Sequence, residues 1–385
     1  MKLQQATFAE LPALGALAPL AAIAPQLVLV FGSVRLLSAE GLLARLHEAF
    51  GSAELAGCTT AGEISDDGVS DERLVITALH FEHPGFRVVS TALAGMADSA
   101  AAGRRLADQL AAPGLHNVLV FGQGVNINGS ALIEGFRQGL APEVALSGGL
   151  AGDGGAFTRS YTLSSQAVSS EQIVAIGFTA PELQLRHGCF HGWQPFGPAR
   201  KVTRCEGNVL HELDGAPALE VYKKYLGEYA RDLPGSGLLF PFEMLGQDHH
   251  AVGLIRTILG VDEAAGSLIL AGDIVQDGYL KLMHATTDSL VDGAHEAAAA
   301  AGVDNAAAGC SLALLVSCVG RKLVMGARVD EEVESVAEVF GRHAHVTGFY
   351  SNGEISPALA SGSGGECHLH NQTMTITHLS ERHAV

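Results

Sequence analysis

Apolar runs that open a strand–helix–strand pattern occur three times along the chain, at residues 28–32, 118–122 and 313–318. Each run is followed by a stretch with the apolar spacing of an amphipathic helix, then by a glycine-rich segment, and then by another apolar run. Strands that alternate with helices predict an α/β protein of layered sheets and helices. Their recurrence predicts repeated strand–helix–strand units that bury their apolar faces against one another.

Two of the glycine-rich segments share the pattern G-x-x-[ST]-x-G-E-I-S, at residues 57–65 and 348–356. A looser relative, S-G-G-L-A-G-D-G-G, occupies residues 147–155. The shared pattern predicts that the first glycines of the two copies, Gly57 and Gly348, take matching places at strand ends. The second glycines of the copies are expected to match as well.

The polar members of this motif allow two interpretations. In the first, the hydroxyls of Thr60 and Ser351 and the carboxylates of Glu63 and Glu354 line a ligand pocket, because open α/β sheets bind ligands beyond the carboxyl ends of their strands. In the second, each glutamate accepts backbone N–H groups and locks a turn that the fold needs twice. Under both, we expect the glutamates to be buried and hydrogen-bonded, since a buried unpaired carboxylate is costly. Tyr350 gives the last copy an apolar side suited to a pocket.

The order of the predicted elements suggests two domains. Residues 1–180 hold two units, residues 181–210 form a connecting region, and residues 211–385 form the second domain. A serine- and glycine-rich segment, 361–365, is either a mobile lid or a plain surface loop.

Composition and charge exclude several classes of protein. With 48% hydrophobic and 17% charged residues, the chain is not disordered. Its net charge of −18 argues against binding to nucleic acid or to anionic lipid. The uncharged segment 11–32 resembles a leader, but three prolines interrupt it and it ends in a predicted strand, so we expect no membrane segment. Six scattered cysteines fit reduced thiols and a cytoplasmic location.

Sequence motifs of the common enzyme classes are missing. The chain has no phosphate-binding G-x-x-x-x-G-K-[ST] loop, no H-E-x-x-H, no C-x-x-C and no G-x-S-x-G. We therefore do not expect an enzyme.

Several of these motifs together resemble the FIST family of bacterial and archaeal sensory proteins. They are G-C-T-T-A-G-E-I-S, S-G-G-L-A-G-D, G-F-Y-S-N-G-E-I-S-P, G-W-Q-P-F-G at 192–197, C-V-G-R at 318–321 and H-N-Q-T at 370–373. The resemblance implies a sensor of a small ligand. In its length and in having no output domain of its own, the chain looks like the stand-alone members of the NosP type. Those members bind haem b non-covalently, sense nitric oxide and act in trans on a histidine kinase or a cyclic-di-nucleotide enzyme.

Candidates for the haem iron lie in the segment 186–193, where His187, Cys189 and His191 alternate as they would on one face of a strand. Imidazole is the usual neutral iron ligand, and His191 is preferred over His187 because it directly precedes the G-W-x-P-x-G string. Trp193 provides an apolar side chain against which the flat haem macrocycle could pack. Arg321 suits a ligand carboxylate or a haem propionate, but we favour an ion pair with Glu354.

Two alternatives remain open. One is a sensor of an amino-acid-like metabolite, whose carboxylate is held by Arg321 or by the glycine-rich turns. The other is a metal-assisted hydrolase that uses His187, Cys189 and His191, with Glu63 or Glu354 as the base.

Overall fold

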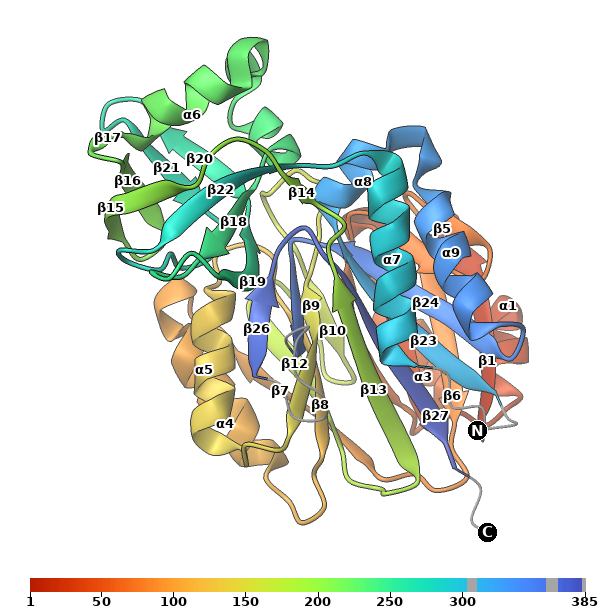
Figure 1. Cartoon of the computed structure of the whole chain (residues 1–385). Coiled ribbons are helices and arrows are strands. Elements are labelled where there is room, and N and C mark those ends of the chain that lie inside the picture. The colour runs from red at the N-terminus through yellow and green to blue at the C-terminus, as the bar shows by residue number, and fades with distance from the viewer. Residues whose placement is uncertain (303–309, 358–365, 383–385) are drawn as a thin grey trace.

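Three units with the same order of elements form the main body of the protein (Figure 1). The structure is a computed structural model and describes residues 1–302, 310–357 and 366–382. An inserted unit, residues 191–286, separates the first strand of the third unit from the rest of that unit. The segment 361–365, discussed above as a lid or a loop, lies outside the described residues.

The elements follow one another in the same way in each unit. The first unit contains β1 (Lys2–Phe8), α1 (Leu14–Ala21), β2 (Leu27–Gly32), α2 (Val34–Leu37), α3 (Leu42–Phe50), β3 (Glu54–Thr59), β4 (Glu63–Ser65), β5 (Gly68–Ser70) and β6 (Leu74–His80). The second contains β7 (Phe86–Ala92), η1 (Met96–Asp98), α4 (Ser99–Leu110), β8 (Asn117–Gly122), α5 (Gly129–Gly139), β9 (Ala145–Leu150), β10 (Thr162–Ser164), β11 (Val168–Ser169) and β12 (Gln172–Phe178). The third contains β13 (Leu183–Phe190), α7 (Thr287–Ala301), β23 (Ser311–Cys318), α8 (Val319–Met325), η4 (Gly326–Arg328), α9 (Asp330–Phe340), β24 (Ala344–Ser351), β25 (Gly353–Pro357), β26 (Cys367–His370) and β27 (Met374–Glu381).

Each unit lends its short hairpin to the sheet of another unit. The sheet orders are β1-β6-β2-β3-β10-β11, β7-β12-β8-β9-β25-β26 and β13-β27-β23-β24-β4-β5. The hairpin of the second unit therefore completes the first sheet, that of the third unit completes the second sheet, and that of the first unit completes the third sheet. This cyclic exchange joins the three sheets into one ring, in which no unit has a complete sheet of its own. The prediction of an α/β fold built from repeated units is confirmed.

The first glycines of the motifs occupy equivalent places in the three sheets. Gly57, Gly148 and Gly348 each pair with the central parallel strand of their unit, opposite Val30, Val120 and Leu315. A Cβ atom on any of the three would lie only 1.8–2.0 Å from the carbonyl oxygen of the residue opposite. The prediction that Gly57 and Gly348 match is confirmed, and the steric reason is the close approach of two backbones.

The second glycines also match. Gly62 lies opposite Tyr350, and Gly353 lies opposite Leu150, which holds the place in its own strand that Tyr350 holds in β24. Each directly precedes the glutamate of its motif.

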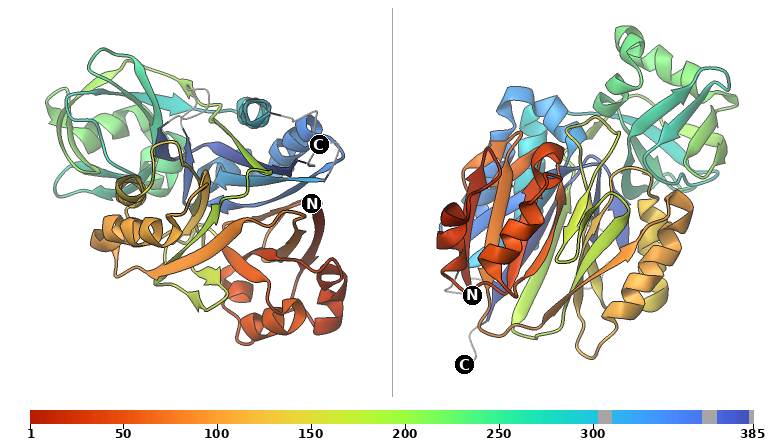
Figure 2. Two further views of the ribbon diagram at one scale, coloured as in Figure 1. Left: turned by 90° about the horizontal axis from the view of Figure 1, so that it is seen from below. Right: turned by 180° about the vertical axis from the view of Figure 1, so that it is seen from behind.

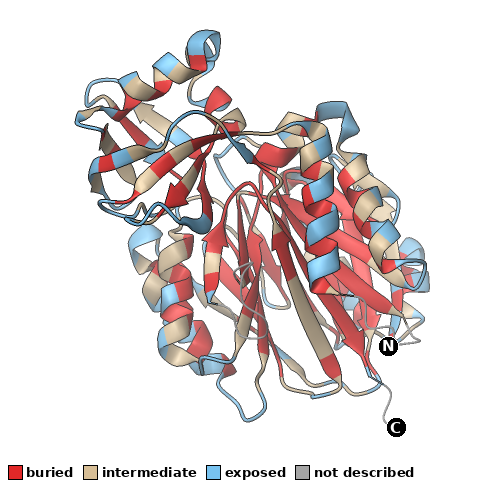
Figure 3. Ribbon diagram, in the orientation of Figure 1, coloured by how far each residue is buried: buried red, intermediate tan, exposed pale blue. Residues whose placement is uncertain are grey.

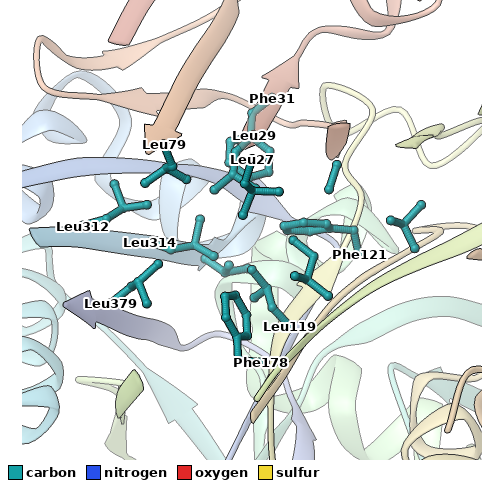
Figure 4. Close-up of a cluster of buried hydrophobic side chains, with 14 of the residues drawn as sticks. Leu27, Leu29, Phe31, Leu79, Leu119, Phe121, Phe178, Leu312, Leu314 and Leu379 are labelled. Atoms are coloured by element: carbon teal, nitrogen blue, oxygen red, sulfur yellow. The ribbon is translucent and has the colours of Figure 1, made fainter. Parts of the chain in front are cut away.

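Apolar faces of the three sheets meet in a single central core (Figure 4). At its centre lie Phe31, Phe121 and Phe349, one from each unit, with ring centroids 5.0, 5.5 and 6.2 Å apart. Helices cover the outer face of each sheet and build a second apolar layer there (Figure 2). The central strands are accordingly buried along almost their whole length and the edge strands β1, β5, β7 and β13 only in part, whereas the helices leave one face exposed (Figure 3).

The inserted unit has its own sheet and its own core. It contains β14 (Gln194–Pro195), β15 (Arg200–Glu206), β16 (Val209–Leu213), β17 (Ala216–Pro217), α6 (Ala218–Leu226), η2 (Gly227–Asp232), η3 (Gly235–Leu239), β18 (Phe242–Leu245), β19 (Ala251–Arg256), β20 (Ile258–Asp262), β21 (Ser267–Leu270) and β22 (Tyr279–His284). A small apolar cluster joins it to α7 and α8, with Trp193, Ile255 and Met283 on one side and Leu290 and Met325 on the other.

Residues 181–210, the predicted connecting region, hold strands of two different sheets. Strand β13 pairs with β27 along its whole length, and β15 belongs to the inserted unit. The uncharged segment 11–32 forms α1 and β2. Among the residues that the structure describes, no helix combines the length and the apolar character needed to cross a membrane.

Candidate ligand-binding site

Glu63, the glutamate of the first motif, is buried and fully hydrogen-bonded. Its Oε1 accepts the hydroxyl of Thr60 at 2.5 Å, and its Oε2 accepts the backbone N–H of Arg73 at 3.0 Å. The hydroxyl three residues before the carboxylate and the N–H at the start of β6 thus hold one turn together.

Glu354 repeats this arrangement in the third unit. Its Oε1 accepts the hydroxyl of Ser351 at 2.7 Å, and its Oε2 accepts the hydroxyl and the backbone N–H of Thr373 at 2.8 and 3.1 Å. The prediction that both glutamates are buried and bonded to backbone N–H groups is confirmed. Burial raises the pKa of Glu63 and of Glu354 to about 7, although the hydrogen bonds from their hydroxyl and N–H partners act in the opposite direction.

The second unit holds the equivalent turn together without a carboxylate. Its hairpin strand has Thr162, Leu163 and Ser164 where the other units have Glu, Ile and Ser. The hydroxyl of Thr162 donates to the carbonyl of Gln172 at 3.0 Å, and the Gln172 amide donates back to the carbonyl of Thr162. In the described residues the motif glutamates therefore serve the turn, and their oxygens are occupied.

Arg321 does not pair with Glu354, contrary to our expectation. Its guanidinium is fully buried and contacts Glu332 of α9, with Nη2 at 2.8 Å and Nε at 3.2 Å from Oε2. Tyr350, another predicted site residue, donates its hydroxyl to the other oxygen of Glu332 at 2.5 Å. Arg321 also donates to the carbonyls of Leu290 and His191. The carboxylate of Glu332 on α9, eleven residues further along the chain, takes the place that we expected for Glu354. Together with the two carbonyls it leaves no face of the guanidinium free for a ligand.

His187 and His191 lie at different places in the fold. His187 sits on β13 between two sheets, where Nε2 is 2.7 Å from Asn117 Oδ1 and Nδ1 is 3.4 Å from the hydroxyl of Thr377. His191 follows β13, accepts the N–H of Trp193 at Nδ1 and stacks on Phe190. Burial lowers the pKa of both histidines to about 4, so both are neutral at pH 7.

The two histidines differ in how far their ring nitrogens are occupied. Both ring nitrogens of His187 have partners, whereas in His191 the printed hydrogen bond is the one that Nδ1 accepts from the N–H of Trp193. Within residues 1–302, 310–357 and 366–382, no three His, Cys, Asp or Glu side chains are grouped so that they could hold a metal ion. His187, Cys189 and His191 are accordingly not grouped in this way.

The turn between β26 and β27 connects the last motif with the inserted unit. Thr373 holds Glu354, and Gln372 donates its side-chain amide to the carbonyl of Leu238 at 2.9 Å. The carbonyl of Gln372 accepts the indole N–H of Trp193 at 3.0 Å. Trp193 thus anchors the inserted unit to the turn between β26 and β27.

A cavity with a volume of about 110 Å³ lies where the inserted unit meets the second unit and the β25–β26 hairpin, and it is partly open to solvent. It lies beyond the carboxyl ends of the parallel strands β8 and β9, where open α/β sheets commonly bind ligands. Its lining residues are Met96, Gly124, Ile127, Asn128, Gly129, Leu150, Asn208, Leu259, Leu270, Ala271, Gly272, Asp273, Asn352, Leu369 and Asn371. We call this cavity the junction pocket.

Two asparagines that line the junction pocket have side-chain oxygens that accept no hydrogen bond from a described residue. Asn371 is 2% exposed, and its Oδ1 has no hydrogen-bond partner among the described residues. Asn352 Oδ1 is likewise buried and without a described partner, although its amide nitrogen donates to the carbonyl of Gly124. A buried polar atom without a partner is costly, and a ligand that donates hydrogen bonds removes this cost.

Sequence reasoning came close to these asparagines but missed them. Asn352 is one of the variable residues of the last motif, and Asn371 belongs to the H-N-Q-T string. The feature of the sequence that could have indicated them is an asparagine next to a turn that contains a predicted buried glutamate. The residues supplied by the inserted unit could not be found in this way, because only the folded chain brings residues 208 and 259–273 to this edge of the ring.

Comparisons with known proteins identify both parts of the chain. Residues 26–216 match the FIST N domain and residues 218–357 match the FIST C domain. An uncharacterized protein of Methanocaldococcus jannaschii is 25% identical over 213 residues, which make up 51% of this chain and 40% of that protein. A crystal structure of a cyanuric acid hydrolase from A. caulinodans aligns with 99% of this chain and 99% of its own, at 10% identity and a TM-score of 0.36, a similarity too low to support an argument.

Proposed function

Because the chain belongs to the FIST-domain family, whose domains are sensory ligand-binding domains of signalling proteins, we propose that it senses a small molecule bound in the junction pocket. The observation that carries this proposal is that two residues lining this cavity, Asn352 and Asn371, each have a buried amide oxygen without a hydrogen-bond donor among the described residues. They suit a ligand that brings N–H or O–H groups.

The position of the pocket supports a sensory role. Its walls come from the ring on one side and from the inserted unit on the other, and the chain crosses between these two bodies only near residues 191–194 and 284–287. A ligand that contacts both walls favours one relative position of the two bodies over others. Signalling then follows from the difference in the ligand's affinity for those positions.

We further propose that a partner enzyme, a histidine kinase or a cyclic-di-nucleotide enzyme, reads this change in trans. All six cysteines are free thiols, which fits a reducing compartment, so a cytoplasmic location remains part of the proposal.

The test is thermal unfolding of the full chain against a library of small metabolites. We expect at least one compound to raise the unfolding temperature, because a ligand that binds only the folded state stabilises it. The variant Leu259→Trp narrows the mouth of the pocket and should abolish the rise. Val252→Trp, an equally exposed position of the inserted unit outside the pocket, should not. A library with no stabilising compound, or a rise that Leu259→Trp leaves unchanged, would contradict the proposal.

Haem binding at His191 or His187, with nitric oxide as the gas ligand, stays a prediction. In its favour, the lowered pKa of His191 keeps the imidazole neutral, as an iron ligand must be. Against it, Nδ1 of His191 already accepts the backbone N–H of Trp193. The absorbance spectrum of the purified protein with added haemin decides: a strong haem band that His191→Ala weakens supports it, and a spectrum of free haemin excludes it.

A further inference from the structure

A thiol, an imidazole and a carboxylate lie in one row at the amino ends of the parallel strands β23 and β24. They belong to Cys310, His345 and Asp66. Nδ1 of His345 donates to Oδ2 of Asp66 at 2.5 Å, and His345 also makes a side-chain hydrogen bond with Cys310. A nucleophile beside a base that a third group orients is the arrangement by which proteins activate a thiol. None of the three residues lines the junction pocket.

The register of β23 and β24 explains why Cys310 and His345 meet. Leu312 lies opposite His345 in this parallel pair, so both side chains leave the same face of the sheet. Cys310 comes two residues before Leu312 and faces the same way. In agreement with this, Leu312 is a member of the central core and Cys310 packs against that core.

Asp66, in the turn between β4 and β5, is held in place from two other strands. Its Oδ1 accepts the backbone N–H of Val346 at 2.7 Å, and its own N–H donates to Oε1 of Gln5 in β1 at 2.9 Å. Gln5 in turn donates to the carbonyl of Val346 at 2.9 Å. The hairpin that the first unit lends to the third sheet thus places a fixed carboxylate against His345.

His345 is positively charged at neutral pH. Its hydrogen bonds with Asp66 and Cys310 raise its pKa to about 10, although burial acts in the opposite direction, and these two are the described titratable groups that act on it. A positive charge beside a cysteine favours the thiolate, which is the nucleophilic form. The side chains of His345 and Asp66 are 39% and 38% exposed and Cys310 is partly exposed, so the row is open to solvent.

The other five cysteines have different surroundings. Burial raises the pKa of four of them, Cys58, Cys189, Cys318 and Cys367. Cys205 is partly exposed like Cys310, but burial and the carboxylate of Asp277 raise its pKa, and its Sγ donates to Oε1 of Gln276 at 3.0 Å. Cys205 is therefore a control within the same chain, a partly exposed thiol beside a carboxylate instead of an imidazole.

From this arrangement we infer that Cys310 is a modification site, at which small disulfides form a mixed disulfide with the protein. The Cys310 thiolate attacks one sulfur of R–S–S–R, a bond forms between the two sulfurs, and the R–S–S–R bond breaks. The departing thiolate takes the proton of His345, which regains one from solvent. The small disulfide is the oxidant, so the step needs no other co-reactant.

Thiol–disulfide exchange makes fewer demands on a site than the other reactions of an activated cysteine. It needs a thiolate, access to its sulfur and a proton for the departing thiol, and the row provides all three. Acyl transfer also needs donors for a developing oxyanion. The inference concerns a site separate from the junction pocket and does not rest on the proposed function.

Labelling of the full chain with 2-hydroxyethyl disulfide, followed by peptide mapping in a mass spectrometer, tests the inference. The probe is small and neutral, so its charge favours neither thiol. At pH 7 we expect Cys310 to form the mixed disulfide at least about tenfold faster than Cys205. Excess dithiothreitol should restore the free thiol.

Three variants show whether the neighbours cause this reactivity. His345→Gln removes the positive charge and Asp66→Asn removes the carboxylate that holds it, so each should slow the reaction of Cys310 by about fivefold or more and spare Cys205. Asp67→Asn removes the same charge from the next residue and should change neither rate. In an NMR titration, Asp66→Asn should lower the midpoint of His345, which a purely structural role of Asp66 would leave in place.

Each contrary result overturns a defined part of the inference. Equal rates at Cys310 and Cys205, or no mixed disulfide at Cys310, would refute the modification site, and wild type alone decides this even where a variant fails to fold. A rate at Cys310 that both His345→Gln and Asp66→Asn leave unchanged would show that the row does not activate the thiol. An unchanged midpoint of His345 in Asp66→Asn would remove the role given to the carboxylate.

Discussion

At the scale of single residues, Glu354 combines burial with a fully occupied set of acceptors. A folded-state pKa of about 7 against an ordinary value of 4.5 means that the native protein holds the proton more tightly than the unfolded chain. The stabilisation is therefore complete below about pH 4.5 and is lost as the pH rises through 7. At about 1.4 kcal/mol per pKa unit, the loss amounts to about 3 kcal/mol.

Glu354→Gln should remove this pH dependence and keep the fold. The glutamine oxygen can accept from Thr373, and its amide can donate to the hydroxyl of Ser351. The stability of the variant relative to wild type should thus increase by about 3 kcal/mol between pH 5 and pH 8. Urea unfolding at both pH values measures it, and a difference that is the same at both would show that Glu354 does not titrate in this range.

Glu354→Ala provides the contrast. It leaves the Ser351 hydroxyl and two donors of Thr373 without an acceptor and opens a cavity, so we expect a loss of about 3 kcal/mol or more at pH 5. Equal stability of the alanine variant, the glutamine variant and wild type would place the side chain in solvent.

The pair of Arg321 and Glu332 is a second residue-scale case. Removing one partner strands a buried charge, so Arg321→Met and Glu332→Gln should each cost about 3–5 kcal/mol. The double variant should cost clearly less than the two single losses together, and a double-mutant cycle by urea unfolding measures the difference. Additive losses would mean that the two side chains do not interact.

At the scale of elements, the glycine of β3, β9 and β24 decides whether two parallel strands can pair closely. We predict that Gly57→Ala, Gly148→Ala and Gly348→Ala each destabilise the protein by about 3 kcal/mol or more, because the new methyl group overlaps a backbone carbonyl that cannot move away. Gly15→Ala in α1 is the control. It meets open space and should be neutral or stabilising by up to about 1 kcal/mol.

Thermal unfolding of these four variants and of wild type measures the change in stability. The prediction concerns all three motif glycines, so a single one of them that melts with wild type would break the equivalence of the units.

The sequence predicts most strands and helices of the ring, but it does not predict the exchange of hairpins that joins the three sheets. Periodicity located the central strands and the helices because each buries one face, and the shared G-E-I-S string revealed two equivalent hairpins. The third hairpin was missed because residues 153–161 separate it from its glycines and a threonine replaces the glutamate. Which sheet receives each hairpin is a long-range choice that local patterns do not encode.

At the scale of the whole molecule, the inserted unit and the ring meet around Trp193, the only tryptophan of the chain. Gln372 holds this contact through its bond to Leu238 and has a φ of +61°, which asparagine tolerates. Gln372→Asn is too short to reach Leu238, so it should loosen the contact and increase quenching of Trp193 by acrylamide while the circular dichroism stays unchanged. Gln138→Asn, on the exposed face of α5, is the matched control. Identical quenching in all three proteins would show that Gln372 does not hold the inserted unit.

The site itself was only partly accessible to sequence reasoning, for the same large-scale reason. The motif residues Thr60, Glu63, Ser351 and Glu354 were found, and they hold turns. The cavity beside them depends on the inserted unit, whose place over β8, β9 and α5 follows from packing between segments far apart in the chain.

Hydrogen–deuterium exchange of the full chain, with and without the most stabilising compound of the metabolite library, tests the central claim most directly. A ligand in the junction pocket should slow exchange in the first turn of α5, in residues 268–273 and in residues 368–372, and leave residues 187–190 unchanged. The same measurement on Leu259→Trp should show no slowing. Protection confined to the neighbourhood of His187 and His191, or absent from all three pocket segments, would contradict a sensor site between the ring and the inserted unit.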